Sequence, residues 1–110
     1  MVSDVKLKEL KEMAKQVRRN VVTCVGTECP GHLGGSMSSA DLVTALYFYK
    51  MNYDPKDPKR DRFILSKGHA SAAIYSVLAE TGFFKPEELV THCKNGSRLS
   101  GHATHKIPGI

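Results

Sequence analysis

The chain has 110 residues, with 41% hydrophobic and 25% charged residues, which is typical of a folded globular domain and excludes disorder and fibres. No apolar run approaches the roughly 20 residues that cross a bilayer, and the first turns of the sequence are too charged for a secretory signal. The net charge of +5 without interleaved aromatic residues indicates a solvated basic surface rather than a nucleic-acid interface. Three cysteines, an odd number without a signal, favour reduced thiols and a cytoplasmic location.

The first half of the chain predicts two helices joined by a loop. An amphipathic helix is expected from about Asp4 to Cys24, where apolar residues recur on one helical stripe. Residues 26–36 are expected to form a loop, because four glycines and a proline in this short segment disfavour a helix. Ser38 and Asp41 have capping-box spacing, so a second, short buried helix is predicted from there to Tyr49.

The second half predicts one strand and two further helices. Arg62–Ser66 contains three consecutive apolar residues, which favours a short buried strand. The other expected elements are a turn at 54–58, a helix at 70–81 capped by Gly82, a helix from Pro86 to about Asn95, and a loop over 97–110. Helices around a strand–turn–helix unit predict an α/β fold.

Glycine precedes histidine three times, at His32, His69 and His102, whereas composition alone predicts about 0.4 such pairs. Glycine lets a ligand approach the backbone closely, and histidine can exchange a proton or bind an anion near neutral pH. The three pairs therefore suggest a polar small-molecule site. Three independent loop histidines are equally compatible with the spacing.

His69 carries the sharpest expectation of the three. It lies between the predicted strand and the next helix, and α/β sheets bind ligands at the carboxyl ends of their strands. The helix N-terminus beyond it favours phosphate through free N–H groups and the helix dipole. Ligand contact is favoured over the alternative, a residue that satisfies backbone groups near the helix cap.

Metal and thiol chemistry are not supported by the spacings. Cys24, Cys29 and His32 match no usual zinc pattern and lack a fourth ligand. His92 and Cys93 are adjacent on a predicted helix, where neighbouring side chains do not face each other. The sequence therefore predicts neither a metal site nor a catalytic cysteine–histidine pair.

Several segments closely resemble transketolase, and the resemblance covers nearly the whole chain in one order. The segments are 31–41, Asp61–Ala70 (Asp-Arg-Phe-Ile-Leu-Ser-Lys-Gly-His-Ala), 74–83, 96–102 and 107–110. The resemblance implies that residues 1–110 are the N-terminal portion of the diphosphate-binding domain, an incomplete thiamine-diphosphate-binding α/β fold with a parallel sheet flanked by helices. The short leader before His32 resembles the split form, in which the N- and C-terminal subunits are separate chains.

The resemblance implies transfer of a two-carbon ketol unit between sugar phosphates, with thiamine diphosphate and Mg²⁺ as cofactors. In similar enzymes the residue matching His69 contacts the cofactor near its diphosphate, and that matching Gly35 lies near the thiazolium ring. Residues matching His32 and His102 reach substrate hydroxyls. The alternatives are a related thiamine enzyme, of the deoxyxylulose-phosphate or dihydroxyacetone synthase type, and a non-catalytic truncated interaction module.

The chain also departs from the family pattern. The Gly-Asp-Gly stretch that holds the divalent ion is absent, and the glutamate that activates the cofactor belongs to a later domain. The chain therefore looks truncated, carries no metal ligand and no direct nucleophile or base, and is expected to be inactive alone. The expected partners are sugar phosphates and a C-terminal transketolase subunit or domain in a homo- or hetero-oligomer, without nucleic acid or membrane.

Overall fold

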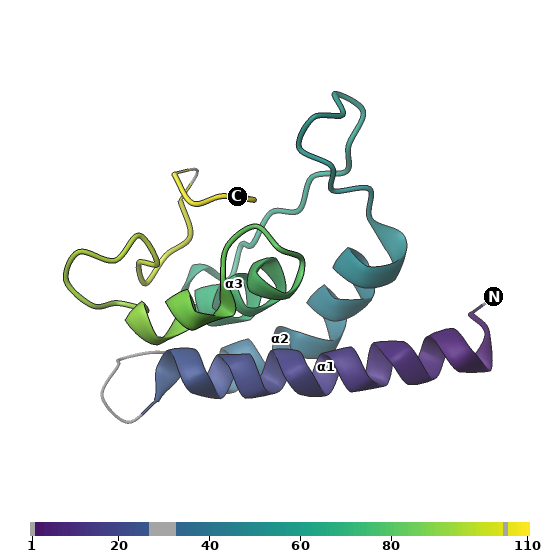
Figure 1. Cartoon of the computed structure of the whole chain (residues 1–110), viewed down its shortest axis with the longest axis horizontal. Coiled ribbons are helices and arrows are strands. Elements are labelled where there is room, and N and C mark those ends of the chain that lie inside the picture. Colours follow the sequence, from purple (N-terminus) through teal and green to yellow (C-terminus); the bar gives the residue numbers. More distant parts are fainter. Residues whose placement is uncertain (1, 27–32, 105) are drawn as a thin grey trace.

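The computed structural model describes residues 2–26, 33–104 and 106–110, and helices form its framework (Figure 1). The elements in chain order are α1 (Asp4–Val25), α2 (Leu33–Ala45), the π-helical turn η1 (Leu46–Lys50), the 3₁₀ turn η2 (Gly68–Ala70), α3 (Ser71–Glu80) and the 3₁₀ helix η3 (Pro86–Thr91). The helices α1, α2 and α3 all pack against one another. Within the described ranges, no helix has both the length and the apolar character that a membrane span requires.

The N-terminal helix α1 confirms the first expectation from the sequence. Its first turn is capped by Ser3, whose Oγ accepts a hydrogen bond from the Lys6 backbone N–H at 3.1 Å. Gly26, with a φ of +47°, ends the helix by leaving helical geometry. The apolar stripe lies against the core, where the buried members are Ala14, Val17, Val21 and Cys24.

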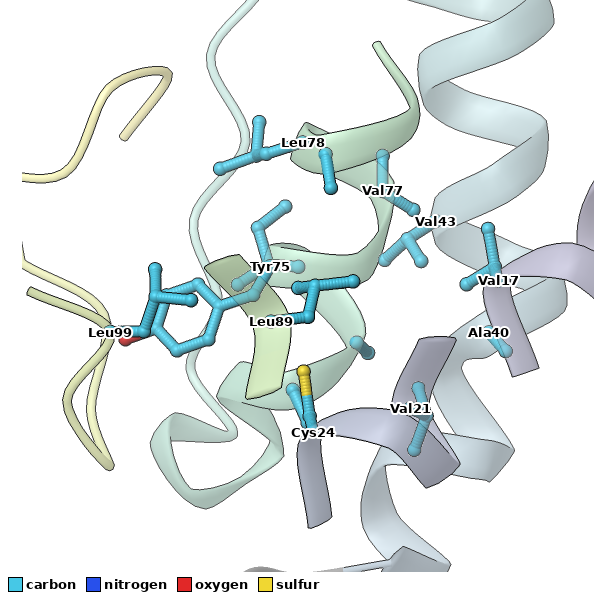
Figure 2. Packing of buried hydrophobic residues seen from close by; sticks show 14 of the residues in the cluster. Val17, Val21, Cys24, Ala40, Val43, Tyr75, Val77, Leu78, Leu89 and Leu99 are labelled. Atoms are coloured by element: carbon cyan, nitrogen blue, oxygen red, sulfur yellow. The ribbon is translucent and has the colours of Figure 1, made fainter. Parts of the chain in front are cut away.

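The helix α3 lies at the centre of the core (Figure 2). Every residue from Ser71 to Ala79 is buried. Its apolar character on all sides explains this position, because such a helix must be covered all round. Gly82, at φ +92°, follows its end, and the N–H groups of Gly82 and Phe83 bond back to the carbonyls of Ala79 and Leu78 at 3.2 and 3.1 Å. This is a Schellman ending, which confirms the predicted role of Gly82.

The predicted strand at 62–66 does not form among the described residues, so the parallel sheet of the expected α/β fold is not confirmed. The segment 62–66 forms neither a helix nor a hydrogen-bonded pair of strands. Ile64 is 83% exposed, while Phe63 and Leu65 are half-buried. The alternation is that of a strand. A parallel strand needs hydrogen-bonding neighbours, and none of the described residues belongs to a strand that could supply them.

The second helix begins earlier than the sequence suggested. Residues 33–36 were expected to lie in a loop, yet α2 starts at Leu33, so Gly34 and Gly35 are helical. Ser38 is therefore inside the helix, and its Oγ donates to the Gly35 carbonyl at 3.0 Å instead of capping a new start. The capping-box prediction was wrong, and Asp41 instead forms an ion pair with Arg18 of α1. The predicted burial up to Tyr49 holds only in part, since exposed side chains include Leu42 and Tyr49.

The last predicted helix is shorter than expected and is a 3₁₀ helix. It ends at Thr91 rather than near Asn95. Beyond it Cys93 has a φ of +60°, and no other non-glycine residue in the described ranges has a positive φ. The Cys93 N–H bonds to the Leu99 carbonyl at 2.8 Å, which folds the chain back on itself.

Candidate functional site

His69 lies in η2, the 3₁₀ turn that leads into α3, and its side chain is exposed. The turn is closed by a hydrogen bond from the Ala70 N–H to the Lys67 carbonyl at 2.9 Å. The predicted place of His69, beside a helix N-terminus, is therefore correct. The residue follows extended coil rather than a strand.

His69 and His102 meet although they are far apart in the sequence. Their ring centroids are 4.5 Å apart and the rings are inclined at 75°, an edge-to-face arrangement. Both side chains are exposed, so a ligand could reach them. The structure thus brings together two of the three histidines that follow glycine, while His32 lies outside the described residues.

Gly68 makes this meeting possible. A Cβ at this position would lie 2.7 Å from Nδ1 of His102, a separation that side chains do not tolerate. Only a residue without a side chain allows the His102 ring to pack directly over the turn that carries His69. The sequence predicted that glycine would let a ligand approach the backbone closely, and at Gly68 the group that approaches is the His102 side chain.

The segment around His102 is anchored to α3 by hydrogen bonds. Ser71 Oγ donates to the Gly101 carbonyl at 2.7 Å, and the Tyr75 hydroxyl donates to the Ser100 carbonyl at 2.5 Å. Ser100 Oγ in turn donates to the carbonyl of His102 at 2.7 Å. Since Ser71 and Tyr75 are buried, these contacts hold the loop in a fixed position on the central helix.

Lys67 links the turn that carries His69 to α2. The sequence did not mark this lysine as a site residue. Its Nζ donates to the Gly35 carbonyl at 3.3 Å and to Ser38 Oγ at 3.0 Å. A Cβ on Gly35 would be 3.4 Å from Cε of Lys67, so the lysine chain crosses α2 close to this glycine. The signal was present in the sequence, as a cation directly before a Gly-His pair.

The charges of the site suit an anion. Lys67, His69 and the N-terminus of α3 lie close together in the chain, and an ammonium group together with a helix N-terminus favours a negatively charged ligand. These groups fit the diphosphate of thiamine diphosphate. In the parts of the chain that the structure describes, no group of three histidine, cysteine or carboxylate side chains could hold a metal ion.

A cavity of about 610 Å³ adjoins the cluster. It follows the extended segment 60–65, is walled by Tyr47 and Phe83, and reaches Gly68 and His102. His102 therefore lies between the exposed polar cluster and a largely apolar hollow. A side chain in that position can contact both a charged and an uncharged part of one ligand.

Comparison with known proteins decides the family. The family model described as "Transketolase, thiamine diphosphate binding domain" matches residues 9–110. The chain belongs to this family. It is 40% identical over 107 residues to an apulose-4-phosphate transketolase subunit from Actinobacillus succinogenes, and 38% identical over 104 residues to human transketolase. These matches cover 93% and 92% of this chain but only 39% and 17% of the two relatives.

The fold agrees with that assignment. Transketolase from Leishmania mexicana matches the whole chain with a TM-score of 0.81 and 29% sequence identity, over 16% of its own length. A 6-deoxy-6-sulfo-D-fructose transketolase subunit of a Clostridium species is 39% identical over 97 residues, which cover 35% of that relative. The chain is thus similar to the N-terminal region of transketolase and spans less than two-fifths of the length of these relatives.

Proposed function

We propose that this chain is the N-terminal portion, residues 1–110, of the diphosphate-binding domain of a transketolase that moves a two-carbon ketol unit between sugar phosphates. The observation that carries the proposal is the edge-to-face contact of His69 and His102, next to a turn whose Lys67 bonds to Ser38 of α2. An anion-binding group and a proton-exchanging group then share one small site. The family match supports the same assignment.

In this proposal Lys67 and His69 hold the diphosphate of the cofactor together with the N-terminus of α3. Gly35 contributes through its lack of a side chain, which leaves the space beside Lys67 open to the cofactor, since a Cβ there would lie in contact with the lysine chain. Bound thiamine diphosphate would supply the stabilisation of a carbanion that no protein side chain can provide. The protein would supply binding, orientation and electrostatics.

His102 acts on the sugar substrate in this proposal. Its imidazole, beside the cavity and next to His69, can accept or donate a hydrogen bond at a substrate hydroxyl. Such a group can also move a proton as a carbonyl and an alkoxide interconvert near neutral pH. The same role is proposed for His32, which lies outside the described residues.

The Mg²⁺ ion and a second polypeptide belong to the same proposal. A divalent ion requires several oxygen ligands in fixed geometry, and residues 97–110 contain no Asp or Glu that could provide them.

Two of the relatives named above are called subunits, which supports a separate C-terminal partner. A reduced, cytoplasmic setting remains the expectation from the three cysteines.

The deciding experiment uses the complete natural protein that contains this chain, with its partner chain where there is one. Transfer from a ketose phosphate to an aldose phosphate is measured with and without thiamine diphosphate and Mg²⁺. Activity that requires both cofactors, and that falls by roughly 10²–10⁴-fold in His102→Ala, is the expected result. Absence of any ketol transfer with a range of sugar phosphates would overturn the proposal.

A further inference from the structure

His92 and Cys93 form a contact that is separate from the histidine cluster. Nε2 of His92 lies 3.6 Å from Sγ of Cys93. The sequence predicted that these adjacent side chains would not face each other. The helix ends at Thr91, however, and the positive φ of Cys93 turns its side chain back toward the imidazole. The prediction against a cysteine–histidine pair was therefore wrong about the geometry.

The imidazole is held rigidly beside the sulfur. His92 is only 2% exposed, and the ring of Tyr75 packs against it edge to face at a centroid distance of 5.7 Å. Burial lowers the pKa of His92, and a hydrogen bond with the Cys24 backbone opposes that decrease. Nδ1 of His92 has no hydrogen-bond partner of ordinary geometry in the described part of the chain. The Nε2 atom, 3.6 Å from the sulfur, lies within reach of the thiol proton.

The Cys93 side chain is more exposed to solvent than that of Cys24, the other cysteine that the structure describes. Cys93 is half-buried, whereas Cys24 has no exposed surface and lies in the core (Figure 2). Reactive cysteines are those that are partly exposed and lie beside a group that promotes the thiolate. Cys93 is partly exposed and lies beside an imidazole that can act as a base, whereas Cys24 has no exposed surface.

The sulfur also lies against the loop that carries His102. A Cβ on Gly101 would be 3.7 Å from Sγ of Cys93, an ordinary van der Waals distance, so the sulfur faces the Gly101 backbone across the space that a side chain there would occupy. Gly101 precedes His102, and its carbonyl is bonded to Ser71. An oxygen atom added to the sulfur on this side would fill that space and press on the segment.

We propose that Cys93 is an oxidation site for hydrogen peroxide, with His92 as the proton acceptor, and that oxidation displaces the Gly101–His102 segment. The thiol proton moves from Sγ to Nε2 of His92, and the sulfur electron pair forms a bond to one peroxide oxygen as the O–O bond breaks. The departing hydroxide takes the proton from His92 and becomes water. Sulfur is oxidised, peroxide is reduced, and the products are cysteine sulfenic acid and water.

The inference does not depend on the proposed ketol transfer, and its test needs no activity measurement. The complete natural protein is treated with graded hydrogen peroxide in the presence of dimedone, which traps sulfenic acids, and the labelled peptides are quantified by mass spectrometry. Cys93 is expected to be labelled at least about ten-fold faster than Cys24, a small part of what a positioned base can contribute. In His92→Gln that advantage is expected to fall about ten-fold.

Displacement of the loop is read separately, from the imidazole ¹H–¹³C signals of His102, assigned with His102→Gln. These signals should shift on oxidation of the wild-type protein and stay in place in Cys93→Ser. If His92→Gln does not fold, the labelling rate of the wild-type protein is followed against pH, and it should drop when His92 becomes protonated. Equal labelling of the two cysteines, an unchanged rate in folded His92→Gln, a labelling rate that ignores the protonation of His92, or unmoved His102 signals would overturn the proposal.

Discussion

His69 and His102 contact each other edge to face, with their ring centroids 4.5 Å apart, and Gly68 is the residue that permits the contact. One histidine leads into the central helix, and the other belongs to a loop that Ser71 and Tyr75 fasten to that helix. The two imidazoles therefore share one scaffold but depend on different anchors. Substitutions at these positions are expected to separate their roles.

Replacement of His69 tests the proposed cofactor contact. In the complete protein, His69→Ala is expected to weaken thiamine diphosphate binding, because a hydrogen bond to a charged group contributes about 1.5–3 kcal/mol. That corresponds to roughly 10- to 150-fold in affinity. Titration calorimetry measures the change, with His102→Ala as the control that should bind the cofactor normally. An unchanged affinity in His69→Ala would refute the cofactor role.

Replacement of His102 tests the proposed substrate contact. His102→Ala, and likewise His32→Ala, is expected to lower kcat/KM by roughly 10²–10⁴-fold, because a positioned acid–base group is lost. Cofactor affinity should stay as in the wild-type protein. Steady-state kinetics with a ketose phosphate donor at saturating cofactor separate the two effects. A defect confined to cofactor binding would contradict the substrate role.

The close approach at Gly68 gives a test that leaves both histidines in place. Gly68→Ala introduces a Cβ 2.7 Å from Nδ1 of His102, so the ring must move and kcat/KM should fall as in His102→Ala. Gly34→Ala is the matched control, since a Cβ there meets nothing within 4 Å. Within α2 it should raise stability by roughly 0.5–1 kcal/mol at full activity. Equal activity of the two variants would show that the His102 position is unimportant.

The parts of the fold that could be predicted are those that depend on residues close together in the sequence. The stripe of α1 and the ending of α3 at Gly82 follow from helical periodicity and glycine geometry, and both are confirmed. The predicted strand at 62–66 depends on neighbours that are remote in sequence, and those cannot be inferred from a local pattern. The start of α2 was missed because tertiary contacts outweigh the low helix propensity of Gly34 and Gly35.

The candidate site was predictable in part for the same reason. The glycine–histidine pairs marked His69 and His102 as site candidates, and the structure brings these two together. No pattern could show that Lys67 would cross Gly35, because that contact joins α2 to a distant turn. The pairing of His92 with Cys93 was also hidden, since it depends on where a 3₁₀ helix ends.

The buried His92 predicts a dependence of stability on acid. Its folded pKa lies below the usual value because of burial, so the unfolded chain binds the extra proton between the two values. The contribution of His92 to stability is therefore complete above the ordinary imidazole pKa of about 6.5 and is lost as the pH falls through the folded value. Urea unfolding at pH 7.5 and pH 5 measures it. His92→Gln should lose less stability over this interval than the wild-type protein, and an identical loss would contradict the prediction.

The isolated 110-residue chain is expected to bind thiamine diphosphate only weakly and to show no ketol transfer. A diphosphate bound at Lys67, His69 and the N-terminus of α3 would meet one full positive charge, that of the lysine, together with partial charges. The described residues provide no cluster of side chains that could hold the neutralising metal ion. The exposed Ile64 should also make this piece prone to association, because an apolar unpaired segment invites pairing with another chain.

Thermal melting of the purified 110-residue chain with increasing thiamine diphosphate and Mg²⁺ provides the measurement. A ligand that binds only the folded state raises the melting temperature in proportion to the logarithm of its concentration above Kd, so a weak site leaves the temperature unchanged. The complete protein under the same conditions is the control and should show a clear rise. The variant His69→Ala of the short chain should then melt as the short chain itself does with cofactor present. A concentration-dependent rise in the short chain that His69→Ala removes would show that the anion site is sufficient without the metal ligands, and the prediction would be wrong.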